Sequence, residues 1–305
     1  MSLYHKYRPK SLEELMGNKE VIETLESVLA RETPPHAYLL TGPTGTGKTT
    51  VARIIADRLG CIGTSFREIN AADFRGIDTI RDIRHTSNYT PLEGDVRVWL
   101  IDEAHAITKI AQTALLKLLE DPPAHVYIIL ATTDPKDLIS TIKGRCSTFE
   151  MQLLSDRDML RLLVRVVKEE GESLDKEVYE QIVQDSSGHP RNALVTLDSV
   201  LSVSEDSRLA AAKKTAETQS KAIELCRVLL NERARWKQAG NVLAGLKDEQ
   251  AETVRRIVMA YCTTIILKGM NNRAAIVLEH FMEPFYNTGF PGLVYACYCV
   301  INGGE

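Results

Sequence analysis

A glycine-rich segment followed by lysine and threonine is the strongest chemical signal in this sequence. Residues 42–49 read GPTGTGKT, after a short apolar run at 37–40 and before the helical pattern VARIIADRL. This is the G-x-x-x-x-G-K-[ST] motif in its required order of strand, loop and helix. Backbone N–H groups and the helix dipole then surround a phosphate, Lys48 reaches the β- and γ-phosphates, and the Thr49 hydroxyl ligates Mg²⁺. The motif predicts that the protein binds a nucleoside triphosphate together with Mg²⁺.

Two carboxylates end an apolar segment further along the chain. Residues 98–101 read VWLI and are followed by Asp102 and Glu103. Two acids at a strand end mean little alone, because such an end is often simply solvated. After a complete phosphate-binding loop, however, Asp102 is expected to hold Mg²⁺ through its water shell, and Glu103 to polarise the attacking water. The pair therefore predicts hydrolysis of the bound nucleotide.

Further polar side chains could complete such a site. Thr132 and Thr133 end an apolar strand pattern, where a hydroxyl could reach the γ-phosphate, although both are also ordinary strand residues. Arg145 lies in a loop before the last expected strand, and in a side-by-side assembly it could enter the neighbouring site as an arginine finger. Arg191 starts a helix from which it could contact the γ-phosphate of its own subunit. A solvated surface position is the alternative for both arginines.

A parallel sheet is needed to position these groups. Between 36 and about 152 the sequence alternates strand and helix patterns, which indicates a parallel sheet flanked by helices. Upstream, Ser11 and Glu14 have capping-box spacing for a short helix. The expected strands are 37–41, 66–70, 96–101, 126–131 and 147–151, and the expected helices are 18–31 and those near 48–59, 77–87, 109–120 and 136–142.

Helical patterns occupy the rest of the chain. Three amphipathic segments over 155–205 predict a small helical domain. The polar stretch 204–219 is interpreted as a linker or a poorly packed helix, and 220–303 as a second helical domain. The expected organisation is a nucleotide-binding domain over 1–153, a helical lid over 154–208 and a helical collar over 209–305.

Composition describes an ordinary globular protein. The chain has 305 residues, 44% hydrophobic and 26% charged, and its net charge of −4 neither favours nor excludes nucleic-acid binding. The six cysteines form no disulfide framework, so reduced thiols are expected. No N-terminal secretory pattern is found, and the apolar runs 257–267 and 293–301 are too short to cross a bilayer. We expect a cytoplasmic protein with no membrane partner.

Together, these motifs resemble those of the AAA+ clamp-loader ATPases. The similarity covers about residues 3–200 and is greatest to the bacterial DNA polymerase III gamma/tau subunits and the replication factor C small subunits. The motifs occur in the family's order: Tyr7-Arg8-Pro9, Gly17, the phosphate loop, Asp102-Glu103, Thr133, Gly144-Arg145-Cys146 and Gly188-x-x-Arg191. The resemblance implies an α/β P-loop AAA+ domain with a five-stranded parallel sheet, ATP as the nucleotide, Thr133 as a sensor, Arg145 as a finger acting in trans and Arg191 as a lid sensor.

The resemblance also implies which residues bind ATP and which follow DNA. Those expected around ATP and Mg²⁺ are Leu3, Tyr4, Tyr7, Arg8, Pro9, Met16, Gly17, Thr44, Gly45, Thr46, Gly47, Lys48, Thr49, Thr50 and Arg191. Those expected at the DNA backbone are Arg75, Gly76, Ile77, Arg81 and Lys109, so that binding depends on duplex shape and salt rather than on sequence. For any one of them, a solvated surface residue is an equally good interpretation.

Two departures from the family pattern are visible. Gly144 replaces the serine that usually precedes the finger arginine, which leaves Arg145 and Cys146 intact. The four-cysteine zinc module of the bacterial subunits is reduced to Cys61, so no zinc is predicted. The C-terminal part aligns with nothing familiar, and its assignment as an oligomerising collar is an analogy at the level of the fold.

The implied function is that of an ATPase subunit of a sliding-clamp loader. ATP binding would assemble a spiral of subunits, homo- or hetero-oligomeric and of five members, that opens the clamp and grips primer–template DNA. Hydrolysis would then release the loaded clamp. One alternative is another AAA+ DNA motor or helicase loader, against which Tyr7-Arg8-Pro9 and the Arg145 motif count. The other is a non-hydrolysing structural subunit, which would not need Lys48 or Glu103. The short, zinc-free form would also suit a phage protein acting in a bacterial cytosol.

Overall fold

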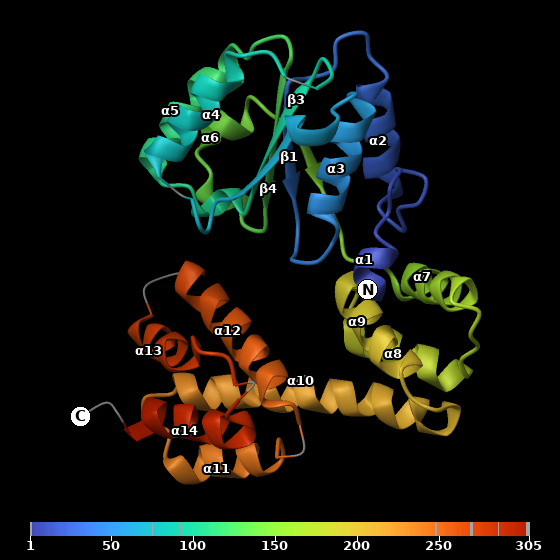
Figure 1. The fold of residues 1–305 in the computed structure, drawn as a ribbon, viewed down its shortest axis with the longest axis vertical. Helices are drawn as coiled ribbons and strands as arrows, with labels where there is room; N and C mark the ends of the chain where they lie inside the picture. Colours follow the sequence, from blue (N-terminus) through green and yellow to red (C-terminus); the bar gives the residue numbers. More distant parts are fainter. Residues whose placement is uncertain are drawn as a thin grey trace. The chain divides into compact units, whose positions relative to one another are not determined.

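The chain folds into two compact units, with the division between Glu205 and Asp206 (Figure 1). The computed structural model describes residues 2–302 apart from 75, 92, 248, 269–270 and 286, and gives the backbone alone for 213–220 and 268. None of the helices in this described part is long and apolar enough to cross a membrane. The predicted boundary near 153, between a nucleotide-binding domain and a lid, falls inside the first unit and stays a prediction.

A five-stranded parallel sheet is the centre of the first unit. Its strands are β1 (Ala37–Thr41), β2 (Phe66–Asn70), β3 (Arg97–Asp102), β4 (Val126–Thr132) and β5 (Ser147–Glu150), in the order β2–β3–β4–β1–β5. Every pairing is parallel, and Leu39 of β1 lies opposite Leu130 of β4 and Thr148 of β5. The predicted sheet is confirmed, because each observed strand end lies within one residue of its prediction.

Helices cover both faces of this sheet. One face carries α2 (Lys19–Leu29) and α3 (Lys48–Arg58), and the other carries α4 (Ile77–Ser87), α5 (Lys109–Glu120) and α6 (Ser140–Lys143). Figure 1 shows the two helical layers on either side of the strands. In β1, Tyr38 packs into the apolar core beneath α2 and α3, and Leu39 packs into the core beneath α4, α5 and α6. Double coverage explains why β1 and β4 are buried along their whole length and apolar up to the threonine that ends each strand.

The predicted helix at Ser11 is wrong. Residues 11–14 form a bend and a turn, although the Glu14 carboxylate still accepts a hydrogen bond from the Lys10 N–H at 2.9 Å. Gly17, with φ of +67°, soon stops any helix that begins at Ser11, and so short a helix is not stable. The turn instead buries Leu12 completely in the core.

The helix predicted over 136–142 is two shorter pieces, η3 (Pro135–Asp137) and α6. The buried side chain of Gln112, on α5, separates them. Its amide donates to the Asp137 carbonyl at 3.1 Å and accepts the Ile139 N–H at 2.9 Å. These backbone groups are the ones that a continuous helix would pair internally.

Three helices, α7 (Asp156–Glu169), α8 (Lys176–Ser186) and α9 (Pro190–Leu201), complete the first unit and confirm the helical patterns over 155–205. The Ser155 hydroxyl caps α7 by accepting the Asp158 N–H at 3.2 Å. The apolar sides of the three helices pack together, with Leu163, Ile182 and Leu197 fully buried.

The N-terminal segment is tied to these three helices. Its short helix α1 (Leu3–Lys6) packs against α9. The Lys6 ammonium donates to the Glu170 carboxylate at 2.7 Å, just after α7. At the other end of the segment, the Asn18 side chain donates to the Gln152 carbonyl at 3.1 Å and accepts the Gln152 N–H at 2.7 Å. Residues 2–18 are thus fixed to the chain beyond β5.

The second unit is all helical. Its helices are α10 (Arg208–Leu230), α11 (Trp236–Ala244), α12 (Ala251–Lys268), α13 (Asn272–Phe281) and α14 (Gly289–Asn302). They share one apolar core that includes Leu225, Val258 and Phe281. Of the two interpretations of 204–219, the linker is wrong and the helix is confirmed, because η4 (Glu205–Ser207) and the backbone of α10 run through this stretch. How well this part of α10 is packed stays a prediction.

A buried ion pair joins separate parts of the second unit. The Glu252 carboxylate accepts hydrogen bonds from the Arg255 guanidinium at 2.8 Å, from Arg256 at 3.3 Å and from the Phe285 N–H at 3.0 Å. Arg255 also donates to the Phe281 carbonyl at 2.8 Å, so the cluster connects α12 to the end of α13. The hydrogen bonds from Arg255 are the main cause that lowers the pKa of Glu252 to about 2.

We expect the second unit to lose stability in acid through Glu252. Its folded pKa of about 2 lies below the usual 4.5, so its contribution is complete above pH 4.5 and is lost as the pH falls from 4.5 towards 2. Urea unfolding followed by Trp236 fluorescence, in a Trp99→Phe background, would measure this. Between pH 7 and pH 3 the parent should lose more free energy of unfolding than Glu252→Gln, which cannot titrate. Equal losses would contradict the prediction.

Candidate nucleotide site

A cavity opens at the carboxyl edge of the sheet in the first unit. It encloses about 1060 Å³, its open mouth included. The N-terminal segment, the loop after β1, the end of β3 and the helices α7 and α9 all contribute to its walls. The lining residues are Tyr4, Tyr7, Arg8, Pro9, Glu14, Leu15, Met16, Thr44, Gly45, Thr46, Gly47, Lys48, Thr49, Thr50, Asp102, Glu103, Met151, Leu154, Leu162, Pro190, Arg191 and Leu194.

The glycine-rich loop is shaped by backbone that only glycine adopts readily. Gly42 has φ of +132°, and a Cβ there would lie 2.1 Å from the Met151 carbonyl oxygen. Gly47 has φ of +97° and precedes the first residue of α3. The Thr46 hydroxyl donates to the Pro43 carbonyl at 2.9 Å and closes the loop. The N-terminus of α3 therefore faces the cavity with its backbone N–H groups available for an anion.

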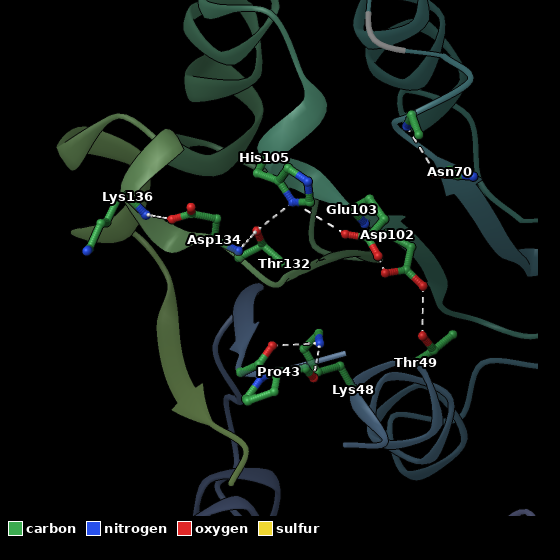
Figure 2. Close-up of polar contacts among 12 residues, drawn as sticks. Pro43, Lys48, Thr49, Asn70, Asp102, Glu103, His105, Thr132, Asp134 and Lys136 are labelled. Atoms are coloured by element: carbon green, nitrogen blue, oxygen red, sulfur yellow. Dashed lines mark hydrogen bonds and ion pairs between the residues drawn. The ribbon is translucent and has the colours of Figure 1, made fainter. Parts of the chain in front are cut away.

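Lys48 and Thr49 are held by neighbours at the cavity wall. The Lys48 ammonium donates to the carbonyl oxygens of Gly42 and Pro43, both at 2.8 Å. Burial lowers the pKa of Lys48, while the negative charges of Glu103 and Asp102 oppose that shift. The Thr49 hydroxyl donates to the Asp102 carboxylate at 2.7 Å, so the two motifs meet as Figure 2 shows.

The two carboxylates at the end of β3 differ in their surroundings. Asp102 is the last strand residue, and besides the Thr49 hydroxyl it accepts the N–H of Glu103 at 2.9 Å. Glu103 has the left-handed φ of +51°, which is costly for a residue with a side chain and is concentrated at functional sites. Its side chain lines the cavity and remains 37% exposed. Asp102 is thus fixed by its bonds, and Glu103 is turned towards the open space.

A histidine that the sequence analysis missed lies behind Glu103. His105 belongs to η2 (Ala104–Ala106), and its ring nitrogen Nδ1 is 3.4 Å from Glu103 Oε2 and 3.1 Å from Thr132 Oγ1. Thr132, the last residue of β4, is fully buried and also accepts the Asp134 N–H at 3.1 Å. Thr133 follows the strand and is not part of the cavity lining, so its role as a sensor stays a prediction.

Arginine side chains from two distant segments meet at Tyr4. The guanidinium of Arg191, on α9, lies 4.8 Å from the ring centroid of Tyr4, and that of Arg8 lies 5.3 Å from it. Arg8 also donates to the Tyr4 hydroxyl at 3.2 Å, while its Nε is buried without a hydrogen-bond partner. Nδ1 of His189, before α9, is 2.8 Å from the Thr44 carbonyl. The helix that carries Arg191 is thereby joined to the phosphate loop.

Two of the residues expected at the nucleotide do not line the cavity. Leu3 is buried, and its helix packs against α9. Gly17 lies behind Leu154, whose Cδ2 would be 2.6 Å from a Cβ at this position. Conversely, the sequence analysis missed Glu14, Leu15, Met151, Leu154, Leu162, Pro190 and Leu194. Most of these are apolar and carried no chemical signal that distinguished them from core residues.

Arg145 lies outside this cavity in its own chain. It donates to the Thr141 carbonyl at 3.0 Å and forms an ion pair with Glu120, the last residue of α5. Its side chain is 35% exposed. Neither Arg145 nor these two partners line the cavity, and a finger acting in trans stays a prediction.

The residues predicted to follow DNA lie at two helix starts. Arg75 falls outside the described residues. Gly76 precedes α4, which begins at Ile77, and Arg81 is 67% exposed in an ion pair with Asp78. The ammonium of Lys109, the first residue of α5, donates to the Asp137 carbonyl. Acidic and basic side chains are mixed on this surface, and contact with DNA stays a prediction.

The described residues offer little for a transition metal. No group of three or more His, Cys, Asp or Glu side chains among them is arranged to hold a metal ion. Cys61 is buried, and burial raises the pKa of its thiol. The expectation of no zinc stays a prediction.

Known proteins resemble different stretches of the chain. The family model for the Rad17 P-loop domain matches residues 2–100, and that for the delta subunit of DNA polymerase III matches 66–155. The DNA polymerase III subunit gamma/tau of Mycobacterium tuberculosis is 35% identical over 232 residues, which are 68% of this chain and 40% of that protein. Subunit gamma of Buchnera aphidicola (Schizaphis graminum) is 34% identical over 67% of this chain and 62% of its own, and subunit tau of Escherichia coli is 31% identical over 65% and 34%.

This chain thus spans about 40% of the length of the first of these relatives. Among solved structures, the RuvB Holliday junction branch migration motor of Thermotoga maritima superposes with a TM-score of 0.58. It is 24% identical and covers 69% of this chain and 72% of its own. At that identity the likeness concerns the fold alone, and it confirms a P-loop AAA+ architecture.

Proposed function

The chain is a P-loop AAA+ protein and a relative of the gamma and tau subunits of DNA polymerase III, and we propose that it is an ATPase subunit of a DNA sliding-clamp loader. The observation that carries the ATPase part is one cavity whose wall contains Lys48, Thr49, Asp102, Glu103 and Arg191. Positioned charges of this kind are what phosphoryl transfer to water requires.

ATP fits this cavity by its chemistry. The backbone N–H groups of 44–49 bind the phosphates, and the Lys48 ammonium exchanges its two carbonyl partners for phosphate oxygens. The base has an apolar wall to pack against, formed by Leu15, Met16, Leu154, Leu162 and Leu194. Arg8, another residue of the cavity wall, adds a positive charge there.

The residues present also fit Mg²⁺. Thr49 Oγ1 and the Asp102 carboxylate are hard oxygen ligands 2.7 Å apart at the cavity wall, and Mg²⁺ characteristically takes only one or two such protein ligands. When bound, Mg²⁺ supplies neutralisation of charge on the phosphates.

In this proposal, side chains of the protein orient the attacking water and stabilise the charge that develops during hydrolysis. The Glu103 carboxylate orients the attacking water and accepts its proton, while Lys48 and Arg191 stabilise charge on the γ-phosphate from within the chain. Arg145 of a neighbouring subunit completes the site. Hydrolysis thus depends on assembly, and we propose a pentameric ring or spiral, of one or several kinds of subunit, around primer–template DNA.

The partners in this proposal are the sliding clamp, primer–template DNA and the other subunits, in the cytoplasm of a cell. A Holliday-junction motor is the first alternative, and the likeness that suggests it extends to the fold alone. A non-hydrolysing structural subunit is the second. It is disfavoured because the hydroxyl, ammonium and carboxylates needed for hydrolysis are all present and close together.

Steady-state ATP hydrolysis by the purified chain, with and without primed DNA, tests the proposal. We expect primer–template DNA to raise the rate more than single strands or blunt duplex do, and the stimulation to fall as salt is raised. A four-way junction serves as the matched control. Greater stimulation by the junction, with branch migration, would favour the motor. No hydrolysis under any condition would favour the structural subunit.

A further inference from the structure

His105 is buried at the ends of β3 and β4, and the proposed hydrolysis assigns it no role. Its side chain is only 7% exposed. Nδ1 faces both the Glu103 carboxylate, at 3.4 Å, and the Thr132 hydroxyl, at 3.1 Å. Figure 2 shows the imidazole between the ends of β3 and β4, pointing towards both groups.

The neighbours of Nδ1 decide which ring nitrogen carries the proton. Without a proton, Nδ1 would direct a lone pair at the Glu103 carboxylate, which is repulsive. With a proton, Nδ1–H donates to Thr132 Oγ1 at 3.1 Å and places positive hydrogen charge 3.4 Å from Glu103 Oε2, a favourable electrostatic contact. The Thr132 oxygen can accept this bond in addition to the one from the Asp134 N–H. The geometry therefore favours the tautomer protonated at Nδ1.

We propose that His105 is a positioning residue for the Glu103 carboxylate, an inference that rests on the proposed ATPase function. Glu103 is partly exposed, and its carboxylate would otherwise sample several rotamers at the cavity wall. The contact with Nδ1–H favours the orientation in which the carboxylate meets the attacking water. Because orientation of reacting groups accounts for a large share of catalysis, this preference raises kcat without changing ATP affinity.

The same contacts connect Glu103 to the segment that carries the finger. Thr132 accepts the Asp134 N–H, and the Asp134 carboxylate accepts the Lys136 N–H at 3.1 Å, at the start of η3. The chain then continues through α6 to Arg145. Hydrogen bonds and an ion-pair contact thus connect Glu103, through His105 and Thr132, to the start of the segment that leads to Arg145.

Three substitutions of His105 separate positioning from packing. Asparagine can place an amide N–H near the position of Nδ1, glutamine places it near Nε2, and alanine places none. We expect His105→Gln and His105→Ala to lower kcat by about 10- to 100-fold, and His105→Asn to stay within about threefold of the parent. KM for ATP, and the affinity for a fluorescent ADP analogue, should change by less than about twofold in all three.

A purely structural role would give a different pattern. All three substitutions would then lower the melting temperature, and His105→Asn would not be rescued in kcat. His125→Asn is the matched control, because His125 lies just before β4, at the other end of that strand, and bonds the carbonyls of Ser87 and Tyr89. Equal kcat for the asparagine and glutamine variants, or parental kcat in both, overturns the inference.

A measurement without hydrolysis separates this inference from the proposed function. Nitrogen-15 NMR of histidine-labelled protein should find the Nδ1–H tautomer of His105, assigned with the His105→Asn variant. The Glu103→Ala variant should lose that preference. An Nε2–H tautomer in the parent, unaffected by Glu103→Ala, overturns the inference even if the protein is an active ATPase. The expected tautomer in a chain without ATPase activity would leave the contact standing and the proposed function refuted.

Discussion

Replacement of Arg145 by alanine is expected to lower kcat for ATP hydrolysis by about 10³- to 10⁵-fold, the range that arginine fingers supply. Nucleotide affinity should remain within about twofold, because Arg145 is not part of the cavity lining of its own chain. Steady-state hydrolysis with primed DNA at saturating ATP measures the first quantity, and titration with a fluorescent ADP analogue measures the second.

The ion pair that Arg145 makes does not oppose this role. Glu120 and Arg145 are both partly exposed, and surface pairs of this kind contribute at most about 1 kcal/mol. Releasing the arginine from Glu120 is therefore easily offset by a charged phosphate in a neighbouring site. Lys143→Ala is the matched control, since Lys143 is a basic residue of the same segment, and it should leave kcat unchanged.

Mixing of variants tests whether the finger acts between subunits. Arg145→Ala keeps an intact cavity, and Glu103→Gln keeps an intact finger. In an equal mixture, about a quarter of the head-to-tail interfaces combine the intact cavity with the intact finger, so activity should partly return. A mixture as inactive as its two components would contradict a finger acting in trans.

The second large effect is expected for Glu103→Gln, which should lower kcat by about 10²- to 10⁴-fold and leave ATP bound. Glutamine has nearly the shape of glutamate but cannot take a proton from water. Thr49, Asp102 and Lys48 keep their contacts with one another and with the phosphate loop. The variant should therefore accumulate in the ATP-bound form, which gel filtration with radiolabelled ATP would detect.

Lys48→Ala provides the contrasting control. It removes the ammonium that binds the phosphates and should weaken ATP binding itself. If Glu103→Gln lost affinity as Lys48→Ala does, Glu103 would be a binding group rather than the group that acts on water. If it hydrolysed ATP at the parental rate, the assignment of the water-orienting role to Glu103 would be refuted.

The sheet could be predicted from the sequence because its signals are local. A continuous apolar run such as 126–131 predicts a strand buried on both faces, and this prediction needs no knowledge of the neighbouring strands. The glycines of 42–49 were equally informative, since Gly42 meets the Met151 carbonyl at a distance that permits no side chain. The Thr49–Asp102 contact followed from these two signals once the strands were placed in parallel.

The rest of the site depends on contacts between distant segments. Leu154, Leu162 and Leu194 line the cavity only because of how α7 and α9 pack, and their sequence signal is that of ordinary core residues. His105 was missed because no spacing rule marks it, and its partner Thr132 is on another strand. The prediction of one helix over 136–142 was wrong for the same reason. The Gln112 side chain, on the distant helix α5, forms hydrogen bonds with the backbone of this segment.

The attachment of residues 2–18 to the far end of the first unit has a consequence for biosynthesis. Lys6 and Glu170 are 164 positions apart in sequence, and Asn18 and Gln152 are 134 apart. A ribosome adds about 5–20 residues per second, so the N-terminal segment emerges on the order of ten seconds before its partners exist. Contacts between such distant positions also form slowly once both are present. The wall of the cavity made by Tyr4 and Arg8 is thus completed only after α9 has been synthesised, and a nascent chain acquires its nucleotide site late, well after the sheet itself can form.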